Sequence, residues 1–179
     1  MQLELLRHPS GRGTLLRAQV VVPRSIDETF EFFADPRNLE ALTPPWLRFR
    51  VTSGGDDGTT YAGQLLEYRL RLHGFPISWR TRISRFEAPH AFADEQLRGP
   101  YAWWRHEHRF EAIGPSSTRM YDEVSYRSRG GALVGGIVDR LFVRRDVERI
   151  FRWRAERLLE LLPPLVPTDS GDVDRPTAG

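Results

Sequence analysis

The stretch that decides the fold of this chain is Gly-Pro-Tyr-Ala-Trp-Trp-Arg-His-Glu-His-Arg-Phe, residues Gly99 to Phe110. Successive side chains of a β-strand point to opposite faces of the sheet. One face of this predicted strand therefore carries Trp104, His106, His108 and Phe110, while the other carries charged residues of both signs. An inward face that mixes aromatic rings with imidazoles suits a ligand cavity better than a dry core.

Segments with the same two-residue alternation lie on both sides of this stretch. Short turns rich in glycine and proline separate them, as expected for antiparallel connections. The alternation predicts seven strands, at Thr14–Val22, Leu47–Thr52, Thr60–Leu72, Ser78–Glu87, Ala91–Arg98, Tyr101–Ala112 and Thr118–Arg127.

Three helices are predicted around these strands. Ser25–Glu28 has the pattern of a capping box and begins a short helix, and a second short helix follows at Asp35–Leu42. An apolar stripe at helical spacing predicts a long helix over Leu133–Leu162, which Pro163 ends. We therefore predict an α+β fold: a curved antiparallel sheet of about seven strands around a long C-terminal helix, with two short helices after the first strand.

Length and composition limit the organisation and the partners of the chain. Its 179 residues fit one domain, which we place at residues 14–162, after an N-terminal extension (1–13) and before a disordered tail (163–179). A net charge of +2 gives no reason to expect nucleic-acid binding. The sequence has no apolar run long enough for stable membrane insertion, no cysteine and no signal-peptide pattern, and we expect a cytoplasmic protein.

The turns suggest how the polar residues of neighbouring strands face one another. A turn at Gly99–Pro100 places Asp94 beside His106, and in the same register Gln96 beside Trp104. If Phe110 pairs with Thr118 across the next turn, Asp122 lies opposite His106. The expected result is a row of Asp94, His106 and Asp122 across three strands.

Three interpretations of this row remain open. A carboxylate beside an imidazole fixes its tautomer and stabilises its charge, which a general acid or base requires, so His106, Asp122 and Asp94 are the catalytic candidates. The rule that buried polar groups are paired favours a structural interpretation instead, in which the row satisfies its own polar groups and fixes the register of the sheet. His106 and His108 also share a face, as metal ligands would, but a site of this kind needs a further ligand, and we expect neither a metal nor another cofactor.

Aromatic residues supply further candidates for the cavity, although large aromatic side chains also make up ordinary cores. The residues that we expect to bind a ligand are Tyr68, Trp79, Asp94, Gln96, Trp104, His106, His108, Asp122, Tyr126 and Phe151. The terminal helix is rich in arginine, but acids at helical spacing indicate a solvated, ion-paired face. Arg144 or Arg154 could still turn inward and bind a ligand carboxylate.

Several motifs resemble a known superfamily over residues 14–162. They are Leu42-Thr43-Pro44-Pro45, Trp79, Asp94-x-Gln96, Gly99-Pro100-Tyr101, Trp104-x-His106-x-His108-x-Phe110, Thr118-x-Met120-x-Asp122-x-Val124-x-Tyr126 and Leu141-Phe142-Val143. The chain resembles the SRPBCC superfamily, which includes START, Bet v 1-like, CoxG-like and polyketide cyclase proteins. Within it, the chain is similar to a bacterial subgroup labelled ligand-binding or cell-division-inhibitor-like. The resemblance implies a helix-grip fold with a hydrophobic cavity between the sheet and the long helix.

We expect a binding protein rather than an enzyme: an apolar or amphipathic molecule, lipid-like or polycyclic, enters the cavity and the polar row orients it. The alternative is a cyclase- or dehydratase-like enzyme in which His106, oriented by Asp122 or Asp94, transfers protons. A second alternative, a protein-interaction module in division or stress control, follows from the subgroup label alone, and the sequence names no protein partner.

Overall fold

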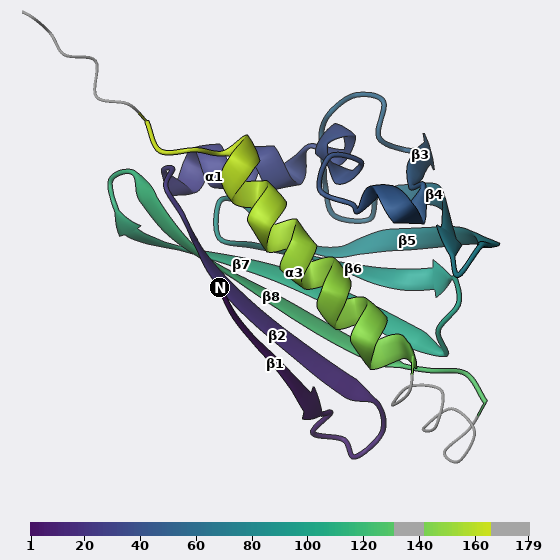
Figure 1. The fold of residues 1–179 in the computed structure, drawn as a ribbon. Helices are drawn as coiled ribbons and strands as arrows, with labels where there is room; N and C mark the ends of the chain where they lie inside the picture. The colour runs from purple at the N-terminus through teal and green to yellow at the C-terminus, as the bar shows by residue number, and fades with distance from the viewer. Residues whose placement is uncertain (131–141, 166–179) are drawn as a thin grey trace, which may run out of the picture.

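The computed structural model describes residues 1–130 and 142–165 (Figure 1). Eight strands and a long helix make up most of this part of the chain, which confirms the α+β prediction. The elements are β1 (Gln2–Arg7), β2 (Thr14–Val22), α1 (Ile26–Ala34), η1 (Pro36–Leu39), η2 (Pro45–Leu47), β3 (Arg50–Ser53), β4 (Leu65–Leu72), β5 (Phe75–Glu87), β6 (Ala91–Arg98), β7 (Trp103–Gly114), β8 (Ser117–Arg127) and α3 (Arg144–Leu161).

The strands form one antiparallel sheet in the order β1-β2-β8-β7-β6-β5-β4-β3. Register shifts between Arg80 and Thr81 and between Ile83 and Arg85 interrupt the pairing of β5 with β6. Such bulges bend a strand and increase its twist. The helix α3 crosses one face of the sheet diagonally, and α1 lies beside its C-terminal end (Figure 1). This arrangement is the helix-grip fold.

Local sequence signals fix the short helices. The Ser25 hydroxyl accepts a hydrogen bond from the Glu28 backbone N–H, and the Glu28 carboxylate accepts one from the Ser25 backbone N–H, so the predicted capping box is present. The carboxylate of Asp35 caps η1, and Pro36 takes its first position, where no backbone donor is needed. This second segment is a short 3-10 helix, shorter than predicted.

The strand count is eight rather than about seven because the expected N-terminal extension contains a strand. Residues Gln2–Arg7 pair with β2 along their whole length, from Gln2 opposite Gln19 to Arg7 opposite Thr14. The partly buried Leu3 and Leu5 pack against the core. Their spacing of two residues is the strand signal, in a segment too short for the alternation to be decisive.

The register between β7 and β8 differs from the prediction by two residues. Phe110 pairs with Met120, not with Thr118, and Asp122 therefore lies opposite His108 instead of His106. The pairing continues up to Gly114 and Ser117, with an extra residue before Gly114. A bulge next to a tight turn sets the register of a hairpin, and turn composition alone does not reveal it. Asp94 pairs with His106 as predicted.

Two hydrophobic clusters stabilise the fold. The first, below α1, includes Phe30, Phe33, Phe110 and Met120, and the second, below α3, includes Leu16, Val124, Tyr126, Val147 and Phe151. Part of the predicted terminal helix and most of the predicted tail fall on residues 131–141 and 166–179, outside the described residues. No helix in the described ranges is long and apolar enough to cross a membrane.

Candidate functional site

A cavity of about 190 Å³ lies between α3 and the concave face of the sheet. Apolar and aromatic side chains supply most of its lining, from α1 and the segment that follows it, from β4, β5, β6 and β7, and from α3. They include Phe33, Leu42, Leu66, Tyr68, Leu70, Ile77, Trp79, Ile83, Phe92, Tyr101, Trp104, Val147, Ile150 and Phe151. Its polar lining includes Asp94, His106, His108 and Arg154.

An aromatic wall closes one side of the cavity. The Trp79 ring lies edge-on to the Trp104 ring, with centroids 5.3 Å apart, and the Tyr101 ring lies 4.8 Å from the Trp104 ring. The Tyr68 ring is 6.1 Å from Trp79, and its hydroxyl donates a hydrogen bond to Thr81 at 3.0 Å. These rings hold one another in place, so the wall is a preformed surface for a flat apolar molecule.

Two imidazoles and a carboxylate form the polar centre. His106 Nε2 is 3.0 Å and His108 Nδ1 is 2.7 Å from the same oxygen, Oδ1 of Asp122. The His106 contact has hydrogen-bond geometry, whereas the N–H of His108 is not aligned with the oxygen and the contact is an ion-pair contact. All three residues are buried. His108 is the cross-strand partner of Asp122, and His106 reaches it along the diagonal.

The electrostatics of this centre determine which nitrogens are available to a ligand. Burial raises the pKa of Asp122, but the contacts with the two imidazoles outweigh it and lower the pKa below the usual range. Burial, and then the neighbouring His106, lower the pKa of His108. An ionised Asp122 only accepts, so His106 donates from Nε2 and its Nδ1 remains available. Asp122 thus fixes the orientation of the His106 imidazole.

Asp94 lies on the other side of His106, with Oδ1 3.9 Å from Nδ1 of the imidazole. Burial raises the pKa of Asp94, and the nearby His106 and Arg154 only partly oppose this. A carboxyl with a raised pKa accepts a proton more readily than an exposed one. The chain therefore holds an Asp-His-Asp row in which one acid is ionised and the other is biased towards its protonated form.

The structure brings most of the predicted ligand-binding residues to the cavity lining: Tyr68, Trp79, Asp94, Trp104, His106, His108 and Phe151. Three others lie outside it. Tyr126 is fully buried in the core cluster below α3, and Asp122 lies behind the two histidines. Gln96 donates a hydrogen bond to the Tyr101 carbonyl and accepts one from its N–H, so it braces the turn before β7.

Sequence reasoning named Phe151 as a ligand-binding residue and Arg154 only as one of two arginines that could turn inward, and it did not name Val147 or Ile150 as part of the lining. The helical stripe identified Ile150 and Phe151 as inward-facing, but the arginine-rich composition of α3 pointed to a solvated face. Arg154 follows the inward-facing Phe151 by three residues, and this spacing places both side chains on the same side of the helix.

His106, His108 and Asp122 also have donor atoms that all lie within 4.8 Å of one another, a set that can ligate a metal. Each imidazole already contacts the carboxylate, and the positive Arg154 acts on the same carboxylate. A neighbouring cation opposes a second one by charge repulsion. The absence of a metal stays a prediction.

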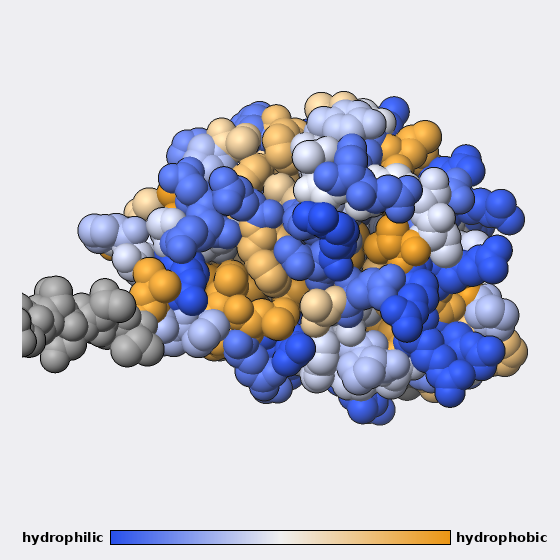
Figure 2. Space-filling model, turned by 90° about the horizontal axis from the view of Figure 1, so that it is seen from above, coloured by the Kyte–Doolittle hydropathy of each residue, from blue (hydrophilic) through white to orange (hydrophobic). Residues whose placement is uncertain are grey.

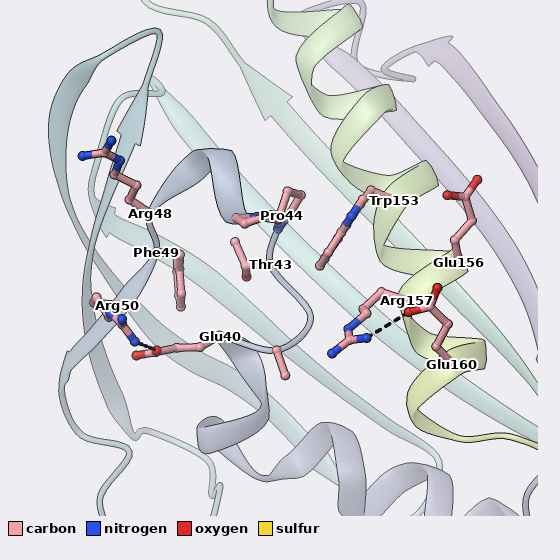
Figure 3. Close-up of a pocket in the computed structure, with 12 residues that line it drawn as sticks. Glu40, Thr43, Pro44, Arg48, Phe49, Arg50, Trp153, Glu156, Arg157 and Glu160 are labelled. Atoms are coloured by element: carbon pink, nitrogen blue, oxygen red, sulfur yellow. Dashed lines mark hydrogen bonds and ion pairs between the residues drawn. The ribbon is translucent and has the colours of Figure 1, made fainter.

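A second, larger hollow lies on the surface between α3 and the segment that carries η2 and β3 (Figure 3). Four of its charged side chains form two ion pairs: Arg50 with Glu40, and Arg157 with Glu160. Figure 2 shows hydrophilic residues interspersed with hydrophobic ones on the face that it draws. The hollow is open and several of its charges are already paired with one another, so the enclosed and mainly apolar cavity is the better candidate for a specific site.

An α3 helix gripped by a curved sheet, with an apolar cavity between them, defines the class as a helix-grip protein. The chain belongs to the polyketide cyclase/dehydrase and lipid transport family, whose model matches residues 22–152. A search of curated proteins finds no match to the chain.

Solved structures with the same fold include enzymes and other proteins. The Zhui aromatase/cyclase from Streptomyces sp. R1128 superposes with a TM-score of 0.66 at 20% identity, covering 83% of this chain and 92% of that one. A START superfamily protein from Mycobacterium smegmatis gives a TM-score of 0.58 at 15% identity, with 82% and 98% covered. Norcoclaurine synthase from Thalictrum flavum superposes with a TM-score of 0.58 at 13% identity, covering 90% of this chain and 98% of that one. At these identities the likeness establishes the fold alone.

Proposed function

We propose that this protein binds an apolar or amphipathic small molecule in the cavity below α3, with the polar end of the molecule at His106 and His108. The observation that carries this proposal is the asymmetry of the cavity lining. Aromatic and aliphatic side chains make up most of it, and among its polar residues Asp94, His106 and His108 lie together, with Arg154 acting on the charge of Asp94. Binding sites for small molecules combine an apolar lining with a few placed polar groups.

The dimensions of the cavity favour a compact ligand. Its volume of about 190 Å³ is below the roughly 300–1,000 Å³ of typical ligand pockets. The aromatic wall of Trp79, Tyr101 and Trp104 offers ring faces and edges instead of a long channel. A molecule with a single ring or two fused rings and a polar substituent fits these features better than an extended lipid chain.

Isothermal titration with 2-naphthol tests the proposal, since this probe has two fused rings and one hydroxyl. We expect one molecule to bind per chain. Ile150→Trp should abolish binding because the larger side chain fills the cavity, whereas Leu159→Trp, on the exposed side of the same helix, should not. If 2-naphthol does not bind, or if it binds equally well to Ile150→Trp, the cavity is not the binding site.

A second candidate function is proton-transfer catalysis of cyclisation and dehydration, which the Asp94-His106-Asp122 row favours. His106 contacts a carboxylate at one nitrogen and faces a protonatable carboxyl at the other. An imidazole held in this way can take a proton from a carbon next to a carbonyl group, so that this carbon attacks a distant carbonyl, and can return the proton to the hydroxyl that leaves as water.

Heptane-2,4,6-trione provides a test, because its aldol cyclisation with loss of one water gives an aromatic diol with a distinct absorption spectrum. The wild-type protein should accelerate this reaction, and His106→Gln should remove the acceleration while the melting temperature stays close to that of the wild type. The absence of acceleration by the wild type, with 2-naphthol still bound, would favour binding alone.

A further inference from the structure

Arg154 is a cation in the cavity without a matching anion. The side chain extends from α3 into the lining shared with Asp94 and His106. Its guanidinium carbon lies 5.5 Å from the centre of the Phe33 ring. Its Nε is enclosed and has no hydrogen-bond partner, and among the described residues no carboxylate lies within ion-pair distance of the guanidinium.

Two other arginines of the same helix are paired with acids. Arg152 contacts Glu148 at 2.7 Å, and Arg157 contacts Glu160 at 2.9 Å, both on the solvent side. Acids are therefore common on α3, but none is directed to the inward face where Arg154 lies. Among the described residues of the helix, Arg154 is the one arginine that lines the cavity. No acid among these residues balances its charge there.

The two acids nearest to this charge do not neutralise it by direct contact. Asp122 is engaged by both imidazoles through one oxygen. Burial biases Asp94 towards its protonated form, in which it carries no charge and can donate a hydrogen bond. Burial also lowers the pKa of Arg154, although both acids oppose this, so the guanidinium is held in an unfavourable environment that a bound anion would relieve.

We propose that Arg154 binds the carboxylate of an aromatic acid whose rings occupy the cavity, an inference that rests on the cavity being the binding site. The planar guanidinium matches a carboxylate through two parallel hydrogen bonds. Asp94 can contribute a further donor when it takes up a proton, which burial favours, and the aromatic wall receives the rings. The ligand class is thus narrowed from amphipathic molecules to small aromatic carboxylic acids.

Titration with 2-naphthoate and 2-naphthol at neutral pH tests this, because the two probes share their rings and differ in charge. The wild type should bind 2-naphthoate more tightly. Arg154→Met should weaken 2-naphthoate binding by about 10- to 100-fold, the range for hydrogen bonds to charged groups, and leave 2-naphthol binding nearly unchanged. The control Arg152→Met, on the solvent side, should change neither.

The outcomes separate this inference from the proposed function. If neither probe binds, both proposals fail. If the wild type does not prefer 2-naphthoate, or if Arg154→Met weakens both probes equally, the cavity binds ligands but Arg154 does not select a carboxylate. Removal of the unpaired inward cation in Arg154→Met should preserve or raise the melting temperature of the free protein.

A second variant, Arg154→Lys, keeps the charge but lacks the planar guanidinium. It should retain part of the preference for 2-naphthoate. Complete loss of this preference in the folded variant would also contradict the proposal.

Discussion

Two neighbouring cross-strand pairs of β7 and β8 show how one face of a sheet serves two purposes. Phe110 faces Met120, and two residues away His108 faces Asp122. All four residues are buried on the same face. The first pair lies in a dry cluster below α1, where the rings of Phe30 and Phe33 come within 5.5 and 5.6 Å of the Phe110 ring. The second lies at the edge of the cavity.

The difference between these pairs arises from what covers them. The phenylalanines of α1 fill the space above Phe110, so that part of the face is close-packed core. Below α3, the His106 ring meets Phe151 at 5.4 Å, but space remains between the helix and the outer strands. Packing therefore stabilises one end of the face, and the other end can hold paired polar groups and a ligand.

The largest effect is expected in the dry pair. Phe110→Ala should lower the free energy of unfolding by about 3–5 kcal/mol, because it removes a buried ring and leaves a cavity. Urea denaturation measures this loss. Phe75→Ala provides the control, since that ring is 74% exposed, and its effect should stay within about 0.5 kcal/mol. Similar losses in the two variants would contradict the assignment of Phe110 to the core.

A somewhat smaller loss should follow from breaking the polar pair. Asp122→Ala leaves His106 and His108 buried without their shared acceptor, and we expect a cost of about 3 kcal/mol at neutral pH. The neighbouring Glu123 pairs with Arg17 at the surface, and Glu123→Ala should cost less than about 1 kcal/mol. If Asp122→Ala were as mild as Glu123→Ala in urea denaturation, the three-residue cluster would not contribute to stability.

The smallest expected effect is a dependence of stability on pH, which the polar pair should cause and the apolar pair should not. The pKa of His108 is lower in the folded protein than its ordinary value of 6.5, so the unfolded chain takes up the proton first on acidification. Stability is therefore complete above pH 6.5 and should decrease below it, with a slope approaching about 1.4 kcal/mol per pH unit. Asp122, with a lowered pKa, acts in the same direction at lower pH, whereas the raised pKa of Asp94 opposes the loss in its own range.

Unfolding of His108→Leu measured between pH 7 and pH 5 should show a much smaller slope than the wild type. His90→Gln is the control, because His90 is exposed, and it should keep the wild-type slope. Phe110→Ala should also keep the slope while lowering stability at every pH. An unchanged slope in His108→Leu would mean that another group controls the acid sensitivity.

The fold was predictable because its signals are local. Two-residue alternation located β2 and β6 at their observed ends, and the capping box located the start of α1. The pairing of Asp94 with His106 followed from the short turn between their strands. The bulge near Gly114 was not predictable in this way, because backbone irregularities depend on packing around the turn, and Asp122 consequently moved from His106 to His108.

The sequence by itself determined the helix-grip class of this protein and the face on which its imidazoles lie, since both depend on the periodicity of apolar residues along each element. Only the tertiary structure decided that Asp122 holds both imidazoles from behind, that Tyr126 belongs to the core, and that Arg154 enters the cavity. The physical reason is that these contacts join strands and a helix distant in the chain, and their geometry depends on how closely α3 docks on the sheet. A change in the distance between α3 and the sheet by about the size of one side chain decides whether the space is a close-packed core or a binding site.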